Sequence, residues 1–156
     1  MKLAMKIVTQ TTPITISGIS IRTSNAKAFE EIPLLWKTFF EKQMLSAIPD
    51  KINDDIYAVY TEYDKVPQSA DDFYSLGYTF IIGAAVSRTD RLPSTLVSTI
   101  IPVAKRAVFP IEPGKPDLVG AEWQKIWQMQ ELQRAFEPDY EHYSANGDID
   151  ILVSLT

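Results

Sequence analysis

The sequence has 156 residues, 46% of them apolar and 22% charged, a balance typical of one folded domain. The net charge of −5 argues against nucleic acid as a partner, because such binding depends on neutralising phosphates. There is no cysteine, which excludes disulfides, thiolate catalysis and thiolate zinc sites. No apolar run is long enough for a signal peptide or a membrane span, so we expect a cytoplasmic protein.

The first predicted elements are a strand, TISGISIRTS, and a helix over residues 26–43. Pro33 interrupts the helical pattern, so we expect a helix start or an irregular turn near it and firm helix only from Leu34 onward. Two strands, DIYAVYTEY and GYTFIIGAAV, follow this helix. The apolar residues that recur at helical spacing and predict the helix are Phe29, Ile32, Trp36, Phe39 and Phe40.

The same order of elements returns in the second half of the chain. The strand IIPVAKRAVFPIEPG comes first, then a predicted helix over residues 119–136, then the strands DYEHYS and DIDILVSL. Trp36 aligns with Trp123, and a Tyr-x-x-Tyr pair occurs in the first strand after each helix. We therefore expect a single domain, residues 1–156, of two pseudo-repeats, about 1–88 and 89–156. The alternative is chance, because many α+β proteins hold two amphipathic helices and several strands.

The balance of strands and helices predicts the fold class. Six or more strands with only two helices cannot form a parallel sheet that is covered on both faces. We therefore expect an α+β protein in which tandem duplicated βαββ units form one largely antiparallel sheet. Both helices should then lie on one face of that sheet.

The most specific motif is WQKIW followed by RAFEPDYEHYSANGDIDILVSL, and IPLLWKTF and IYAVYTEY in the first half agree with it. With these motifs the chain resembles the GyrI-like small-molecule-binding superfamily over nearly its whole length. That superfamily includes the effector-binding domains of AraC-type and MerR-type multidrug regulators. It also includes stand-alone effector-binding proteins from integron cassettes.

The resemblance implies a central ligand groove between the two halves. It also implies a glutamate as the polar anchor for lipophilic, often cationic ligands, and Glu141 occupies that position here. No residues remain ahead of the first strand for a helix-turn-helix, so we expect a free-standing binding unit. Such a unit would contact neither nucleic acid nor a membrane.

Glu141 lies on a strand that precedes an Asn-Gly turn, and alternation puts it on the same face as Tyr143. A two-residue turn pairs Glu141 with Leu152, on the face away from the apolar residues of the next strand. A bulged turn one residue longer pairs it with Val153 on the apolar face. Both registers remain open, and the resemblance favours a Glu141 that points into the groove.

The environment of Glu141 decides its role. A glutamate on a strand is commonly a solvated surface residue. In an aromatic groove, by contrast, the carboxylate either has a raised pKa or awaits a positively charged ligand. The motif match favours the second interpretation.

The tryptophans Trp36, Trp123 and Trp127 allow two interpretations. They can pack as core residues between helices and sheet, or line the groove and offer π faces to a cation. The remaining candidates for the groove, chosen by strand position, are Tyr60, Tyr143 and Phe80.

Other chemistry is weakly indicated. His142 is the only histidine, and it lies on the strand face opposite Glu141, without a serine in a nucleophile-elbow motif. The acidic pairs at residues 71–72 and 148–150 lack the glycine-punctuated loop of a calcium site. We therefore expect no catalytic triad, no metal and no cofactor.

Three functions remain open. The first is a stand-alone protein that binds lipophilic, preferably cationic, drug-like molecules with Glu141 as counter-charge. The second is a hydrolase of cyclopropane-bearing alkylating compounds, an activity known in some GyrI-like proteins, with Glu141 positioning or deprotonating a water. The third is a protein-interaction module, such as a topoisomerase inhibitor or a partner of a regulator. We expect ligand binding rather than turnover.

Overall fold

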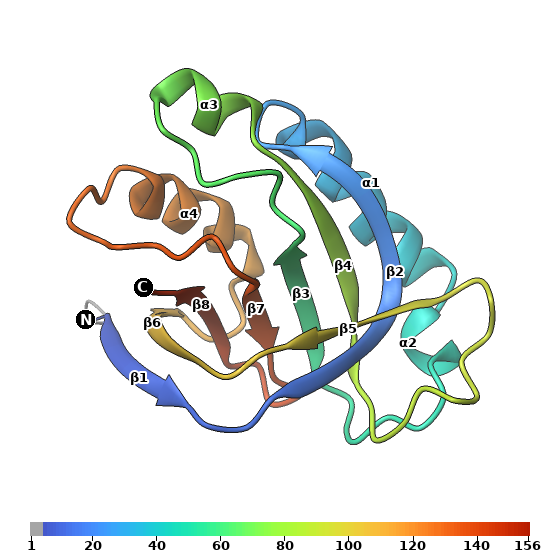
Figure 1. Cartoon of the computed structure of the whole chain (residues 1–156). Coiled ribbons are helices and arrows are strands. Elements are labelled where there is room, and N and C mark those ends of the chain that lie inside the picture. Colours follow the sequence, from blue (N-terminus) through green and yellow to red (C-terminus); the bar gives the residue numbers. More distant parts are fainter. Residues whose placement is uncertain (1–4) are drawn as a thin grey trace.

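The computed structural model describes residues 5–156, in which eight strands form one antiparallel sheet (Figure 1). The strand order across the sheet is β1-β6-β8-β7-β3-β4-β2-β5. The strands are β1 (Lys6–Gln10), β2 (Ile14–Ser24), β3 (Ile56–Thr61), β4 (Gly77–Ala85), β5 (Val97–Ile101), β6 (Ala104–Ile111), β7 (Asp139–Tyr143) and β8 (Ile149–Ser154).

Two longer helices cover the same face of this sheet, as predicted. Leu35 and Phe39 of one helix pack in a core cluster with Ile82 of β4. Trp123 of the other packs in a second cluster with Ile151 of β8. Across the sheet, Ile151 pairs with Glu141, Glu141 pairs with Ala58, and Ala58 pairs with Ile82. Directly paired residues point to the same face, so Ile151 and Ile82 share a face. The helices are α1 (Ala28–Glu41), α2 (Met44–Ala47), α3 (Ala70–Ser75) and α4 (Val119–Trp127), with a 3-10 turn η1 (Pro116–Leu118) before α4.

The order of elements is symmetric about the pairing of β3 with β7. The units β2-α1-β3-β4 and β6-α4-β7-β8 follow one another along the chain. The strand before each unit pairs with the other unit, since β1 pairs with β6 and β5 pairs with β2. We infer from this order one domain with an internal duplication.

Four details of the predicted elements are wrong. Pro33 lies inside α1, which begins at Ala28 without an irregular turn at the proline. The helix predicted over residues 119–136 ends at Trp127. The predicted strand 100–114 overlaps two strands, β5 and β6, with Pro102 between them. β1, which forms one edge of the sheet, was not predicted either.

The second helix ends early because the segment after it pairs with the end of β8. The backbone N–H of Ala135 donates to the carbonyl of Ser154 at 2.9 Å, and that of Thr156 donates to the carbonyl of Gln133 at 2.9 Å. These bonds require an extended segment, which a continuing helix could not provide.

β2 bends strongly along its length (Figure 1). Gly18 of β2 lies opposite Gly83 of β4. A Cβ on Gly18 would lie 2.0 Å from the carbonyl oxygen of Ile82, and one on Gly83 would lie 2.0 Å from that of Ser17. Only glycine at both positions permits this close approach of the two strands.

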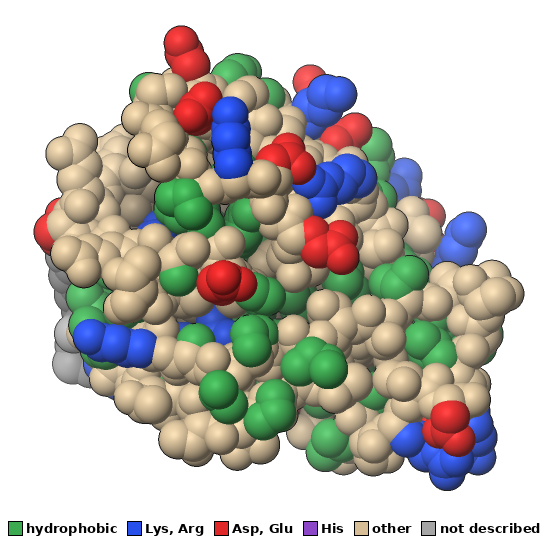
Figure 2. Space-filling view, viewed as in Figure 1, with side chains coloured by type: hydrophobic (Ala, Val, Ile, Leu, Met, Phe, Trp, Pro, Cys, Tyr) green, Lys and Arg blue, Asp and Glu red, His purple; other side chains and the backbone are tan. Residues whose placement is uncertain are grey.

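The sheet face away from α1 and α4 has its own core, which includes Tyr57, Val59 and Tyr140. Arg106 of β6 is fully buried on this side of the molecule and stacks over the Tyr140 ring at 5.1 Å. Exposed apolar side chains also lie over the edge strands and the loop beside them, and Figure 2 shows such side chains where Figure 1 places β5. They include Ile7, Val97, Ile100 and Val103.

No helix among residues 5–156 combines the length and the apolar character needed to cross a membrane.

Candidate ligand-binding site

A cavity of about 280 Å³ lies between α1, α3, α4 and the middle of the sheet. Nine of its 19 lining residues are aromatic, so an organic ligand inside it would meet ring surfaces on most sides. In Figure 1 the segment between β3 and β4 carries α3 to the end of the molecule where α1 begins. Asn25 fixes that position, because its Nδ2 donates to the carbonyl of Phe73 at 2.8 Å. The cavity is thus bounded at this end by α3.

Glu141 of β7 lies at the wall of the cavity with only 2% of its surface exposed. Its Oε2 accepts hydrogen bonds from the Tyr60 hydroxyl at 2.5 Å and from Trp123 Nε1 at 2.7 Å. Its Oε1 accepts a hydrogen bond from the Tyr143 hydroxyl. All three donors are neutral, and no salt bridge to Glu141 is formed within residues 5–156. The carboxylate is therefore solvated by hydrogen bonds but not neutralised.

Burial raises the pKa of Glu141 above its ordinary value, and the hydrogen bonds from the three donors limit that rise. Burial together with the nearby Glu141 carboxylate also raises the pKa of Tyr60 and of Tyr143. Both phenols therefore remain protonated donors at neutral pH. The Glu141 carboxyl group thus lies at the cavity wall among three neutral donors.

The hairpin between β7 and β8 decides which way Glu141 points. Glu141 pairs with Ile151 and Tyr143 pairs with Ile149, so the turn spans residues 144–148. The two-residue turn predicted for this hairpin is wrong. The bulged alternative put Glu141 on the apolar face, as observed, but with Val153 as its partner, which is wrong too. Gly147 allows the longer turn because its φ is 101°.

The structure brings together six of the seven residues that were predicted from the sequence to line the groove. Phe80 does not line the cavity, because it is fully buried behind Tyr60, with the two ring centroids 4.9 Å apart. Trp123 takes part in both the core and the lining. The six that line the cavity are Trp36, Tyr60, Trp123, Trp127, Glu141 and Tyr143.

Several lining residues were missed. Tyr63 and Phe73 come from the excursion between β3 and β4, and Phe73 packs edge-on against Trp127 with centroids 5.5 Å apart. The N-cap pattern of Ser69, whose side chain accepts a hydrogen bond from the Asp72 backbone, was a signal for α3. Arg134 was expected inside a helix, and in the structure it follows that helix and lines the cavity.

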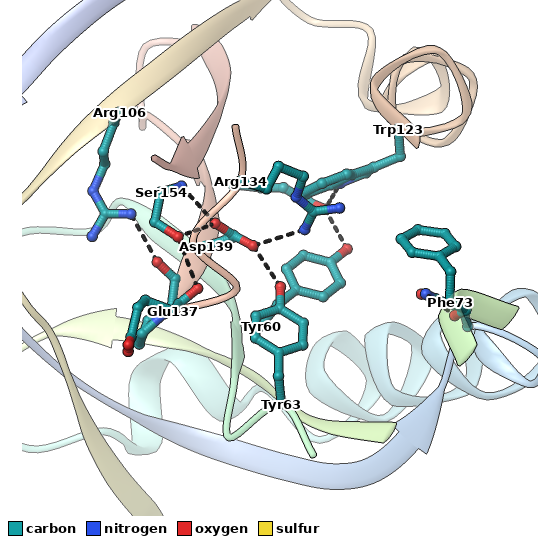
Figure 3. Close-up of polar contacts among 12 residues, drawn as sticks. Tyr60, Tyr63, Phe73, Arg106, Trp123, Arg134, Glu137, Asp139 and Ser154 are labelled. Carbon is teal, nitrogen blue, oxygen red and sulfur yellow. Dashed lines mark hydrogen bonds and ion pairs between the residues drawn. The ribbon is translucent and has the colours of Figure 1, made fainter. Parts of the chain in front are cut away.

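Arg134 forms an ion pair with Asp139 beside the cavity, at 3.0 Å between Nη2 and Oδ2 (Figure 3). The Asp139 carboxylate is fully buried, and Tyr63 donates to the same oxygen at 2.6 Å. Its other oxygen accepts from the Ser154 backbone N–H at 2.6 Å and from the Ser154 hydroxyl at 3.0 Å. This network fixes the guanidinium in place.

His142 lies on the opposite sheet face from the cavity, as alternation predicts. Its Nε2 lies 2.8 Å from Asp55 Oδ2, and its ring stacks on Tyr57 with centroids 4.4 Å apart. These contacts give the histidine a packing role away from Glu141. Within the described residues, no three His, Cys, Asp or Glu side chains form a group suited to a metal ion.

Comparison with known protein families identifies the family of the chain. The sequence model of the Cass2 family, described as integron-associated effector binding protein, matches residues 7–155. The chain belongs to this family. The resemblance inferred from the motifs is thereby confirmed, and membership in an effector-binding family supports a small-molecule binding role. No curated protein sequence matches the chain.

Solved structures share the fold of this Cass2 family member. An integron cassette protein from the mobile metagenome of Vibrio cholerae is 20% identical, with a TM-score of 0.74 over 97% of this chain and 95% of its own. A protein solved with bound tetraphenylphosphonium is 15% identical, with a TM-score of 0.73 over 99% of this chain and 94% of its own. At these identities the likeness establishes the architecture.

Proposed function

We propose that the protein binds lipophilic, cationic small molecules in its aromatic cavity, with Glu141 as the counter-charge. The observation that carries the proposal is a carboxylate that is 2% exposed and held by neutral donors. A buried charge without an opposite charge is costly, and a bound cation would relieve that cost. The related structure with bound tetraphenylphosphonium supports the same chemistry.

The aromatic lining contributes the rest of the affinity. Trp127 is half-buried and lines the cavity together with Trp36 and Tyr143. Rings at such positions supply apolar contact to any lipophilic ligand and about 0.5–2 kcal/mol of cation–π attraction for each well-placed cation. Because neither contribution depends on a particular ligand shape, we propose that the cavity accepts several drug-like cations.

Glu141→Gln tests the proposal, because it keeps the size of the side chain and removes its charge. The glutamine can keep the hydrogen bonds: its oxygen accepts from Trp123 and Tyr60, and its amide donates to the Tyr143 hydroxyl oxygen. The affinity for tetraphenylphosphonium should fall by at least about 1.4 kcal/mol, roughly tenfold. Neutral triphenylphosphine oxide should bind both proteins with similar affinity.

Glu137→Gln is the matched control, since Glu137 is exposed and lies outside the cavity lining. This variant makes the same change in net charge and should bind the phosphonium as the wild type does. Calorimetric titration measures all the affinities. Equal weakening of the cation and the neutral compound by Glu141→Gln, or of neither, would show that Glu141 does not select for charge.

A further inference from the structure

Arg134 carries hydrogen-bond donors that the protein leaves unused at the wall of the cavity. Its side chain is only 9% exposed and lines the cavity. A guanidinium has five N–H donors, and the hydrogen bond that it forms within residues 5–156 runs from Nη2 to Asp139. Its Nε is buried without a hydrogen-bond partner among those residues. Nη1 makes no hydrogen bond among those residues either, and unlike Nε it is not fully closed off, so it is the donor that an acceptor on a ligand would reach.

The guanidinium is held rigidly, which suits a binding role. Its Cζ lies 4.4 Å from the centroid of the Phe136 ring and 5.8 Å from that of the Trp123 ring. Figure 3 shows Arg134 between Asp139 and Trp123, with the guanidinium turned toward the space between Tyr60 and Phe73. Donors fixed in this way lose little conformational entropy when a ligand binds.

The charges around Arg134 determine what kind of acceptor fits. Asp139 already balances the guanidinium, and Glu141 adds a further negative charge at the same cavity. An anionic ligand group would therefore be repelled by the site as a whole. A neutral acceptor, such as an ester or ketone carbonyl, meets the unused N–H groups without that penalty.

We propose that Arg134 forms a second polar subsite, so that the preferred ligands are lipophilic cations that also carry a neutral carbonyl-type acceptor. This inference rests on the proposed function, because it assumes that the cationic end lies at Glu141. Trp123 connects the two subsites: its Nε1 donates to Glu141 and its ring faces Arg134. A ligand with both a cationic group and a neutral acceptor would therefore extend along the Trp123 indole, from Glu141 to Arg134.

Two phosphonium probes separate the subsites. Heptyltriphenylphosphonium has the cation alone, and (3-ethoxycarbonylpropyl)triphenylphosphonium has the same cation and a chain of equal length with an ester. The quantity to measure is the ratio of their Kd values. The contribution of the shared cation cancels within this ratio, and the hydration of the ester cancels when the ratio is compared between protein variants.

The main variant is Arg134→Met with Asp139→Asn, which removes both charges of the ion pair together. The asparagine oxygen can still accept from Ser154, and its amide can donate to the Tyr63 hydroxyl oxygen. Arg134→Lys is a second variant that keeps a positive partner for Asp139 but loses Nε and the planar fork. Arg91→Met with Asp50→Asn is the control, because it makes the same changes at an ion pair outside the cavity.

The preference of the wild type for the ester over the heptyl probe should fall about tenfold in the double variant and fall also in Arg134→Lys. The control should keep the wild-type ratio. If the wild type binds both probes and the ratio is the same in every variant, Arg134 is not a subsite while the proposed function stands. If the wild type binds neither probe, the proposed function and this inference are both overturned.

Discussion

Glu141 combines two properties that shift its pKa in opposite directions. It is buried, which favours the neutral acid, and it receives three hydrogen bonds, which favour the carboxylate. Burial is the larger effect, and the pKa is raised. The charge of this residue is therefore sensitive to pH in a range where an exposed glutamate would already be ionised.

The affinity for a lipophilic cation should depend on pH through this group. The cation needs the carboxylate, so its affinity should rise with pH through the raised pKa of Glu141, in a window above the ordinary value of 4.5. Titrations of tetraphenylphosphonium across that window measure the effect. In Glu141→Gln the affinity should stay flat, and a wild-type curve equally flat would contradict an ionisable anchor.

The empty protein should show the opposite trend in stability. Because the pKa of Glu141 is higher in the folded than in the unfolded state, the folded protein binds more protons between the two values. The contribution of Glu141 to stability is thus most favourable below the unfolded pKa and is lost as pH rises through the folded pKa. A cationic ligand should restore part of this loss.

For single residues, the sequence predicted Glu141 and most of the aromatic lining, because they belong to recognisable motifs. The sequence did not reveal that Arg134 lines the cavity, because helical spacing continues past the true end of α4. Nothing in the pattern indicated that the backbone of Ala135 pairs with that of Ser154. The sequence also could not fix the register of Glu141, since an Asn-Gly pair fits a short turn as well as the observed longer one.

Among the elements, α3 distinguishes the two halves of the molecule. The hairpin of β7 and β8 closes over residues 144–148, whereas the equivalent connection between β3 and β4 makes an excursion that contains α3. This excursion supplies Phe73 to the cavity and is fixed to Asn25. Most strands and the two longer helices could be predicted from the sequence, apart from β1 and the division of residues 100–114 between β5 and β6, but α3 is too short to show periodicity.

Phe73→Ala should weaken the binding of tetraphenylphosphonium about tenfold, because the ring contributes apolar contact at the end of the cavity. The fold should be retained, since Phe73 is only partly buried. Tyr74→Ala is the matched control: the neighbouring ring on α3 is 66% exposed and outside the lining, so binding should not change. Similar losses in both variants would mean that α3 acts through its own folding and not through Phe73.

In the molecule as a whole, Arg106 connects segments that are far apart in the chain. Its guanidinium donates to the Gln10 side chain at 2.5 Å, to the Pro138 carbonyl at 2.7 Å and to the Pro102 carbonyl at 2.9 Å. Burial lowers the pKa of Arg106, while the nearby Tyr140 and Asp139 oppose that change. This one side chain of β6 thus joins the end of β1, the segment between β5 and β6, and the segment before β7.

Arg106→Met should lower the free energy of unfolding by about 3 kcal/mol, because three partly buried acceptors lose a charged donor at about 1–3 kcal/mol each. Urea denaturation with linear extrapolation measures the loss. Lys105→Met changes the exposed neighbour on the same strand and should cost little. Comparable losses in the two variants would contradict the role assigned to Arg106.

Each edge strand of the sheet pairs with the unit that it does not precede in the chain, and this limits the order in which the chain can fold. As the chain emerges from the ribosome, β1 is made first, but its partner β6 is made only after both β4 and β5. The first unit likewise lacks its outer strand until β5 is complete. Such late pairings between distant segments slow folding, because loop closure precedes any gain in contacts. The two halves should therefore reach the native state together, in one late and cooperative step.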